Sequence, residues 1–186
     1  FSLRKCIDTL SGTGLDADFN DNERLVTAMK KIMFVCTGNI CRSPLAEAVF
    51  AHKVEQRDLD AQYAVDSSGT HGYHVGEDAD PRMRKTAAAH GIDFHNASQK
   101  FRARMLDTFD LILAMDPGNY NDIRYAASGH PNLDRVQMFR AYDPLGSADE
   151  EVPDPYFGGS RGFETVFEIV DRTCEALLDH LEQKRR

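Results

Sequence analysis

Apolar and polar residues alternate along this chain in two periods, one typical of strands and one of helices. Four short apolar runs predict strands at Ile32–Val35, Tyr63–Ser67, Phe109–Ala114 and Arg135–Phe139. Helices are predicted at Pro44–Arg57, Asp80–His90 and Pro117–Ala127, and a last one from about Gly162 has the apolar spacing of one buried face: Phe163, Val166, Phe167, Val170, Cys174, Leu177, Leu178 and Leu181. This order predicts a three-layer α/β fold, a four-stranded parallel sheet flanked by helices, with the ligand site at the carboxyl ends of the strands.

The first predicted strand runs directly into a loop with an unusual combination of residues. Cys36 and Arg42 bracket five residues, among them Gly38-Asn39, which tolerate left-handed backbone conformations. Ser43-Pro44 then has the composition of a helix start. A strand, loop and helix in this order gather backbone N–H groups around one point and direct a helix N-terminus at it. The sequence therefore predicts a phosphate loop after the first strand.

The side chains of this loop suit nucleophilic attack on a phosphate ester. Only a thiolate is nucleophilic, and the converging N–H groups and Arg42 would favour the thiolate of Cys36. The planar fork of Arg42 fits two phosphate oxygens, and Ser43 can donate a hydrogen bond to the sulfur. The alternative is a buried cysteine and a surface arginine that merely share a turn. The predicted phosphate-binding residues are Thr37, Gly38, Asn39, Ile40, Cys41, Arg42 and Ser43.

The segment Cys36 to Glu47 matches the pattern C-x-G-N-I-C-R-S-P-x-A-E without a gap, and in this the chain resembles the low-molecular-weight protein tyrosine phosphatases. The resemblance covers about residues 30 to 184 and continues in four further segments: Val65–Thr70, His90–Ile92, Phe109–Asp116 and Asp154–Tyr156. It implies hydrolysis of phosphotyrosine and small aryl phosphates through a cysteinyl-phosphate intermediate, with no cofactor and no metal. We expect residues 30–186 to form this domain and residues 1–29 to be an extension of unknown role.

Ester cleavage also needs a general acid that protonates the leaving oxygen. Four Asp-Pro pairs qualify by composition, at Asp80, Asp116, Asp143 and Asp154, and spacing alone does not choose among them. The resemblance implies Asp154, because its D-P-Y motif shortly precedes the last helix. Asp143 is the second choice.

The resemblance also implies residues around the loop. Ile40, Tyr73 and Tyr156 match positions that line the slot for a phenyl ring. Other positions match the polar network that supports the loop, namely Asn39, Ser43, Ser67 and His95. Cys41 matches an oxidation partner of Cys36. We assign no role to His74.

Composition limits the partners and the location of the protein. A chain of 186 residues can bury one sizeable core, and a net charge of −8 makes a broad nucleic-acid-binding surface improbable. Four cysteines show no metal-ligand spacing, and no apolar stretch is long enough to span a membrane. We expect a cytoplasmic monomer or weak dimer that acts on phosphotyrosine proteins or peptides, with no nucleic acid and no membrane insertion.

Three alternatives remain. Arsenate reductases of the same fold need further cysteines to relay a disulfide, and Cys174 is badly placed inside the last predicted helix. Protein arginine phosphatases typically carry Thr at the position of Ile40 and favour D-P-F over D-P-Y. A non-catalytic phospho-binding module would have no need for the nucleophile Cys36.

Overall fold

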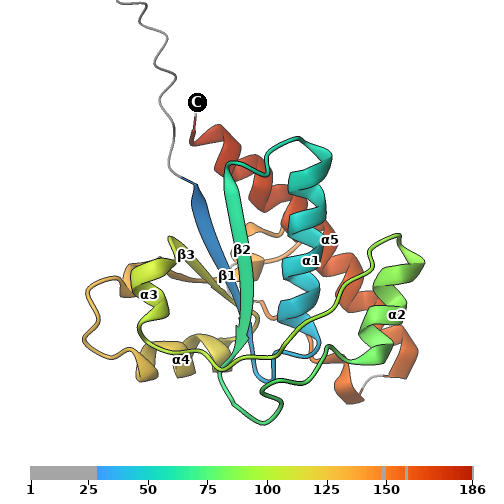
Figure 1. The fold of residues 1–186 in the computed structure, drawn as a ribbon, viewed down its shortest axis with the longest axis horizontal. Coiled ribbons are helices and arrows are strands. Elements are labelled where there is room, and N and C mark those ends of the chain that lie inside the picture. The colour runs from blue at the N-terminus through green and yellow to red at the C-terminus, as the bar shows by residue number, and fades with distance from the viewer. Residues whose placement is uncertain (1–28, 148–149, 158, 186) are drawn as a thin grey trace, which may run out of the picture.

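The computed structural model describes residues 29–147, 150–157 and 159–185. Within them, four parallel strands form one sheet in the order β2-β1-β3-β4 (Figure 1). The strands are β1 (Lys30–Cys36), β2 (Tyr63–Gly69), β3 (Leu111–Ala114) and β4 (Val136–Met138). The predicted fold class is therefore confirmed, and the predicted extension, apart from Met29, lies outside the described residues together with Cys6.

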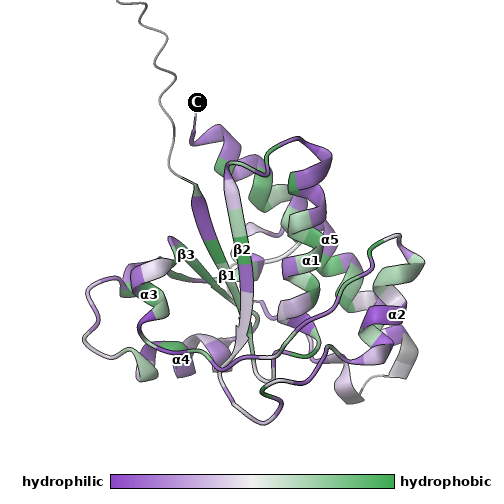
Figure 2. Ribbon diagram, in the orientation of Figure 1, coloured by the Kyte–Doolittle hydropathy of each residue, from purple (hydrophilic) through white to green (hydrophobic). Residues whose placement is uncertain are grey.

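Strand β1 is buried on both faces because helices cover both sides of the sheet. Ile32 and Phe34 belong to one hydrophobic core, whereas Met33 and Val35 belong to a second core on the opposite face. Burial on both faces explains why this strand reads as a continuous apolar run rather than an alternating one. Figure 2 shows β3 green and β1 green beyond its purple start, whereas β2 is mostly pale.

Five α-helices within the described residues flank the sheet. On one face α1 (Arg42–Gln56) packs against α5 (Gly159–Gln183), and α2 (Pro81–Ala89) packs against α5. On the other face lie α3 (Met105–Thr108) and α4 (Pro117–Ala126) (Figure 1). The eight apolar residues predicted to form one face of the last helix are all buried. In the described ranges no helix is long and apolar enough to cross a membrane.

Several element boundaries differ from the sequence prediction, most clearly those of α1, α5 and β4. Helix α1 begins at Arg42, before the predicted start, because the phosphate loop passes directly into the first helical turn and the N–H of Leu45 donates to the carbonyl of Cys41. Helix α5 begins at Gly159. Strand β4 is shorter than predicted because short 3-10 turns occupy Leu133–Arg135 and Phe139–Tyr142 on either side of it, and a third 3-10 turn lies at Pro155–Phe157.

Candidate active site

The sulfur of Cys36 lies at the carboxyl end of β1 and accepts two hydrogen bonds from the loop that follows. The backbone N–H of Asn39 donates to Sγ at 3.3 Å, and the hydroxyl of Ser43 donates at 3.0 Å. The second of these is the hydrogen bond that the sequence predicts. Both hydrogen bonds are of the kind that can stabilise negative charge on a sulfur.

Every carbonyl of the loop from Cys36 to Ile40 accepts a hydrogen bond from outside the loop. In the order of the carbonyls from Cys36 to Ile40, the five donors are Thr70 N (2.8 Å), His71 N (2.9 Å), Ser98 Oγ (3.0 Å), Asn96 Nδ2 (2.8 Å) and Asp80 N (2.7 Å). Because the C=O and N–H of one peptide unit point in opposite directions, these bonds turn the following N–H groups inward. An anion cradle, which the sequence predicts here, needs N–H groups turned in this way.

The Asn39 side chain ties the loop to its neighbours. Its Nδ2 donates to Ser43 Oγ at 3.0 Å and to Ser67 Oγ at 2.8 Å, and its Oδ1 accepts from the N–H of Gln99 at 2.8 Å. Asn39 itself adopts a left-handed conformation, with φ of 57°. Close packing also requires Gly69, since a Cβ there would lie 2.7 Å from the carbonyl oxygen of Thr37.

His95, in contrast, does not contact the loop through its side chain. Its ring bonds to Asp78 and Arg84 at an exposed position, with 67% of the side chain accessible. The next residue, Asn96, donates to the Asn39 carbonyl instead. The residue that contacts the loop therefore lies one position after the predicted His95. A short amide in an irregular segment gives no periodic signal, and only the three-dimensional contact reveals it.

Arg42 is buried and its guanidinium is held on several sides. Nη1 donates to Asp116 Oδ2 at 2.6 Å and to the carbonyl of Val152 at 3.1 Å. Nη2 donates to Thr37 Oγ1 at 3.2 Å and to Asp154 Oδ2 at 3.3 Å. Burial alone would lower the pKa of Arg42, but the neighbouring Cys36 and Asp116 raise it, so the cation is maintained. The roles of Asp116 and Val152 were not predicted from the sequence.

The four Asp-Pro carboxylates have very different surroundings. The Asp143 side chain is fully buried between Arg140 and Arg172. Although burial would raise the pKa of Asp143, hydrogen bonds, first from Arg172, lower it to about 2. Asp80 caps α2 and binds Arg82, while Asp116 binds Arg42.

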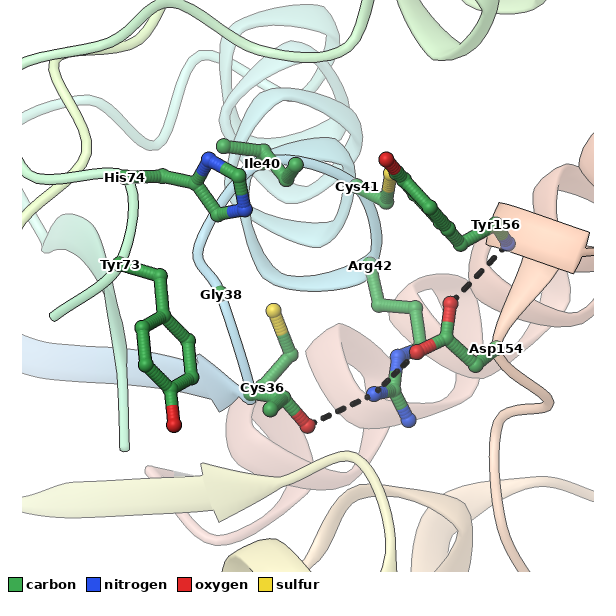
Figure 3. A pocket seen from close by; sticks show the side chains of 10 residues that line it. Cys36, Gly38, Ile40, Cys41, Arg42, Tyr73, His74, Asp154 and Tyr156 are labelled. Carbon is green, nitrogen blue, oxygen red and sulfur yellow. Dashed lines mark hydrogen bonds and ion pairs between the residues drawn. The ribbon is translucent and has the colours of Figure 1, made fainter. Parts of the chain in front are cut away.

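Asp154 alone among the four lines the cavity at the loop, and about half of its side chain is accessible. This cavity has a volume of about 260 Å³ and is lined by Cys36, Thr37, Gly38, Ile40, Cys41, Arg42, Tyr73, His74, Asp154 and Tyr156 (Figure 3). The structure thus brings the predicted nucleophile, arginine, acid and slot residues to one place. It adds His74, which reasoning from the sequence left without a role and whose Nδ1 pairs with Glu77 at 2.7 Å.

Two further features of the cavity concern its cysteines and metal binding. Cys41, within the loop, is buried, and burial raises the pKa of its thiol far above the ordinary range, so this cysteine is a neutral thiol. Within the part of the chain that the structure describes, no three His, Cys, Asp or Glu side chains gather in a way that could hold a metal ion.

Comparison with known proteins agrees with this geometry. The chain is 42% identical over 149 residues to the low molecular weight protein-tyrosine-phosphatase of Streptomyces coelicolor, over 80% of this chain and 91% of that protein. A crystal structure of a protein tyrosine phosphatase from Entamoeba histolytica superposes with a TM-score of 0.78 and 36% identity, over 84% of this chain and 99% of that one. The crystal structure of DARP, a Drosophila arginine phosphatase, gives a TM-score of 0.75 and 34% identity, over 81% and 97% of the two chains.

The profile described as low molecular weight phosphotyrosine protein phosphatase matches residues 31–186, and proteins of that name are hydrolases. The chain belongs to the low molecular weight phosphotyrosine protein phosphatase family.

Proposed function

We propose that this protein hydrolyses phosphotyrosine in proteins or peptides, and small aryl phosphates, through a cysteinyl-phosphate intermediate on Cys36. The observation that carries the proposal is the single cavity lined by the Cys36 sulfur, the Arg42 guanidinium and the Asp154 carboxylate. A nucleophile, a phosphate clamp and a proton donor are the groups that this reaction needs.

In the first step, the Cys36 thiolate attacks phosphorus and a sulfur–phosphorus bond forms as the bond from phosphorus to the phenolic oxygen breaks. Arg42 and the inward N–H groups stabilise the charge that spreads over the phosphoryl oxygens. Asp154 gives its proton to the departing oxygen, so a neutral phenol leaves.

In the second step, water attacks the phosphorus and displaces the Cys36 thiolate. Asp154, now a carboxylate, accepts the proton from that water, and inorganic phosphate is released. Ser43 and the N–H of Asn39 stabilise the thiolate as a leaving group, because both donate to its sulfur. The enzyme returns to its starting state.

Selectivity for an aryl ester rests on the walls of the cavity. Ile40, Tyr73 and Tyr156 line it, and Tyr73 stacks against His71 with ring centroids 5.3 Å apart. The N–H of Tyr156 donates to Asp154 Oδ1 at 3.1 Å, so one short segment holds a wall and the acid together. The phenyl ring of phosphotyrosine is long enough to place the phosphate at the loop while the peptide backbone stays outside these walls. The phosphoserine side chain is too short, so its backbone would collide with the walls before the phosphate reached the loop.

A protein arginine phosphatase is the second candidate, favoured by the similarity to the Drosophila enzyme. Ile40 counts against it because an apolar side chain offers no hydrogen bond to a guanidinium. Tyr156 counts against it because arginine phosphatases favour D-P-F over D-P-Y. An arsenate reductase relay is not supported, since Cys174 is fully buried in α5. A non-catalytic phospho-binding module would leave the nucleophile and the acid without a use.

The test compares the wild type on three matched peptides that carry phosphotyrosine, phosphoserine or phosphoarginine. We expect phosphotyrosine to have the highest kcat/KM by a wide margin, and Ile40→Thr to raise phosphoarginine activity relative to phosphotyrosine. A wild type that prefers phosphoarginine would assign the protein to the second candidate. Binding of phosphotyrosine without turnover would identify the protein as a non-catalytic phospho-binding module.

We further propose a cytoplasmic location and a monomer or weak dimer. The support for the location is chemical: a catalytic thiol must stay reduced, as it does in a reducing compartment. Fractionation of cells and sedimentation of the purified protein test these two points.

A further inference from the structure

One peptide unit of the phosphate loop, between Gly38 and Asn39, joins a buried hydroxyl to the nucleophilic sulfur. Its carbonyl accepts a hydrogen bond from Ser98 Oγ at 3.0 Å. Its N–H donates to Cys36 Sγ at 3.3 Å. The hydroxyl and the sulfur therefore contact opposite ends of the same peptide plane, and the orientation of this plane decides whether a donor or an acceptor faces the sulfur.

This plane has little intrinsic preference for the orientation it adopts. Asn39 has φ of 57°, in the left-handed region, which an asparagine tolerates but adopts less readily than negative φ. Rotation of the peptide would return Asn39 to negative φ, and Gly38, which lacks a Cβ, would not resist it. After that rotation the Gly38 carbonyl would point at the Cys36 sulfur and repel a thiolate. The loop therefore needs a restraint on this carbonyl.

Ser98 is suited to supply that restraint because it is itself fixed. It is buried, with 3% of its surface accessible. Its N–H donates to the carbonyl of Glu77 at 2.9 Å, and its carbonyl accepts from the N–H of Gly76 at 2.8 Å. Of the five donors that hold the loop carbonyls, only Ser98 and Asn96 act through side chains, and Asn96 acts on the next peptide unit.

We propose that Ser98 is a positioning residue for the nucleophile: its hydroxyl holds the Gly38–Asn39 peptide so that the N–H of Asn39 faces the Cys36 sulfur. The inference rests on the proposed function in that it takes Cys36 as the nucleophile. It assigns a specific task to a segment, residues 93–99, in which the sequence pointed to His95 instead.

The test replaces the hydroxyl and compares the variant with a matched control. Ser98→Ala removes the donor, whereas Ser68→Ala removes a buried hydroxyl that has no hydrogen-bond partner among the described residues. Three quantities are measured: the inhibition constant of vanadate, kcat/KM for p-nitrophenyl phosphate, and the alkylation rate of Cys36 by iodoacetate at mildly acidic pH, followed by peptide mass spectrometry. Thermal unfolding of each variant gives its folded fraction.

In Ser98→Ala we expect the vanadate inhibition constant to rise about tenfold, and kcat/KM and the alkylation rate each to fall about tenfold. This is the effect of losing one hydrogen bond to a charged group, here the one from the Asn39 N–H to the sulfur. In Ser68→Ala each quantity should change by less than about twofold. If Ser98→Ala does not fold, Ser98→Cys gives the same test, because it keeps a side chain of the same shape, slightly larger, and replaces the hydroxyl by a weak donor. Equal values for the Ser98 and Ser68 variants, after correction for folded fraction, would overturn the proposal. Alkylation needs no turnover, so it tests Ser98 even if the wild type fails to hydrolyse phosphotyrosine.

Discussion

Arg42, which lines the cavity, forms an ion pair with Asp116, in which Nη1 lies 2.6 Å from Oδ2 and only 4% and 17% of the two side chains are accessible. The pair occupies the half of the guanidinium that also donates to Val152. The other half, Nη2, lies between Thr37 and Asp154. Asp116 therefore fixes the plane of the guanidinium, and so the direction in which Arg42 can hold a phosphate.

We predict that Asp116→Asn lowers kcat/KM for p-nitrophenyl phosphate by about tenfold, because a neutral amide holds a buried guanidinium less strongly than a carboxylate does. Arg42→Lys should be more damaging, since a point charge cannot replace the planar fork. Steady-state kinetics on the purified variants decides this. Wild-type activity in Asp116→Asn would show that Arg42 does not depend on this pair.

Asp154→Asn should slow phosphotyrosine cleavage by about a hundredfold or more, because the leaving oxygen then departs without a proton. The loss should be smaller for esters of more acidic phenols, whose anions leave readily. The matched variant is Asp143→Asn, since Asp143 is bound by Arg140 and Arg172. Asp143→Asn should lower the unfolding temperature and leave kcat/KM of the folded fraction unchanged. Equal kinetic losses in both variants would refute the assignment of the acid.

Glu47 should make stability depend on pH. Burial raises the pKa of its carboxyl from 4.5 to about 7, while a hydrogen bond from Ser67 opposes part of that shift. The folded state thus holds the proton more tightly than the unfolded chain does. The resulting contribution to stability is complete below about pH 4.5 and is lost as the pH rises through about 7. As the pH rises through this window, the unfolding temperature of the wild type should fall relative to that of Glu47→Gln. Parallel curves of unfolding temperature against pH would exclude Glu47 as the source.

Oxidation should distinguish the two cysteines of the loop. The Cys36 thiolate is the more readily oxidised to sulfenic acid, and the buried Cys41 thiol can then condense with it to a disulfide, releasing water. Peroxide should therefore inactivate the wild type reversibly, and should drive Cys41→Ser to sulfinic or sulfonic acid that dithiothreitol does not reverse. Peptide mass spectrometry should find a link between Cys36 and Cys41. Equal recovery of both proteins would remove the protective role of Cys41.

The sequence predicted the fold and the centre of the site because each carries a local pattern. Strand β1 is an apolar run, α5 has one apolar face, and the loop from Cys36 to Arg42 is contiguous in the chain. The proposed slot residue Tyr156 and the proposed acid Asp154 required the resemblance, since Asp-Pro pairs look alike until their surroundings are known. Only the structure shows that Asp143 is buried between two arginines.

The contacts that support the loop could not be predicted from the sequence, for a different reason. Ser98 and Asn96 act on backbone carbonyls some sixty residues away in the chain, and a carbonyl has no sequence signature. Asp116 reads as an ordinary helix cap, which it also is, because its Oδ1 accepts from the N–H of Asn119. Contacts of this kind depend on packing between elements and do not follow from residue type or period.

The central claim is that turnover passes through a phosphoryl group on Cys36, and trapping that group tests it most directly. The enzyme is mixed with excess p-nitrophenyl phosphate, quenched in alkali during turnover, digested, and analysed by mass spectrometry, with Cys36→Ser as the control. We predict a phosphorylated peptide that contains Cys36 in the wild type, and no turnover in Cys36→Ser although it still binds vanadate. Turnover in Cys36→Ser at a tenth of the wild-type rate, about 1.4 kcal/mol in activation free energy, or product formation without any phosphocysteine peptide, would contradict the account.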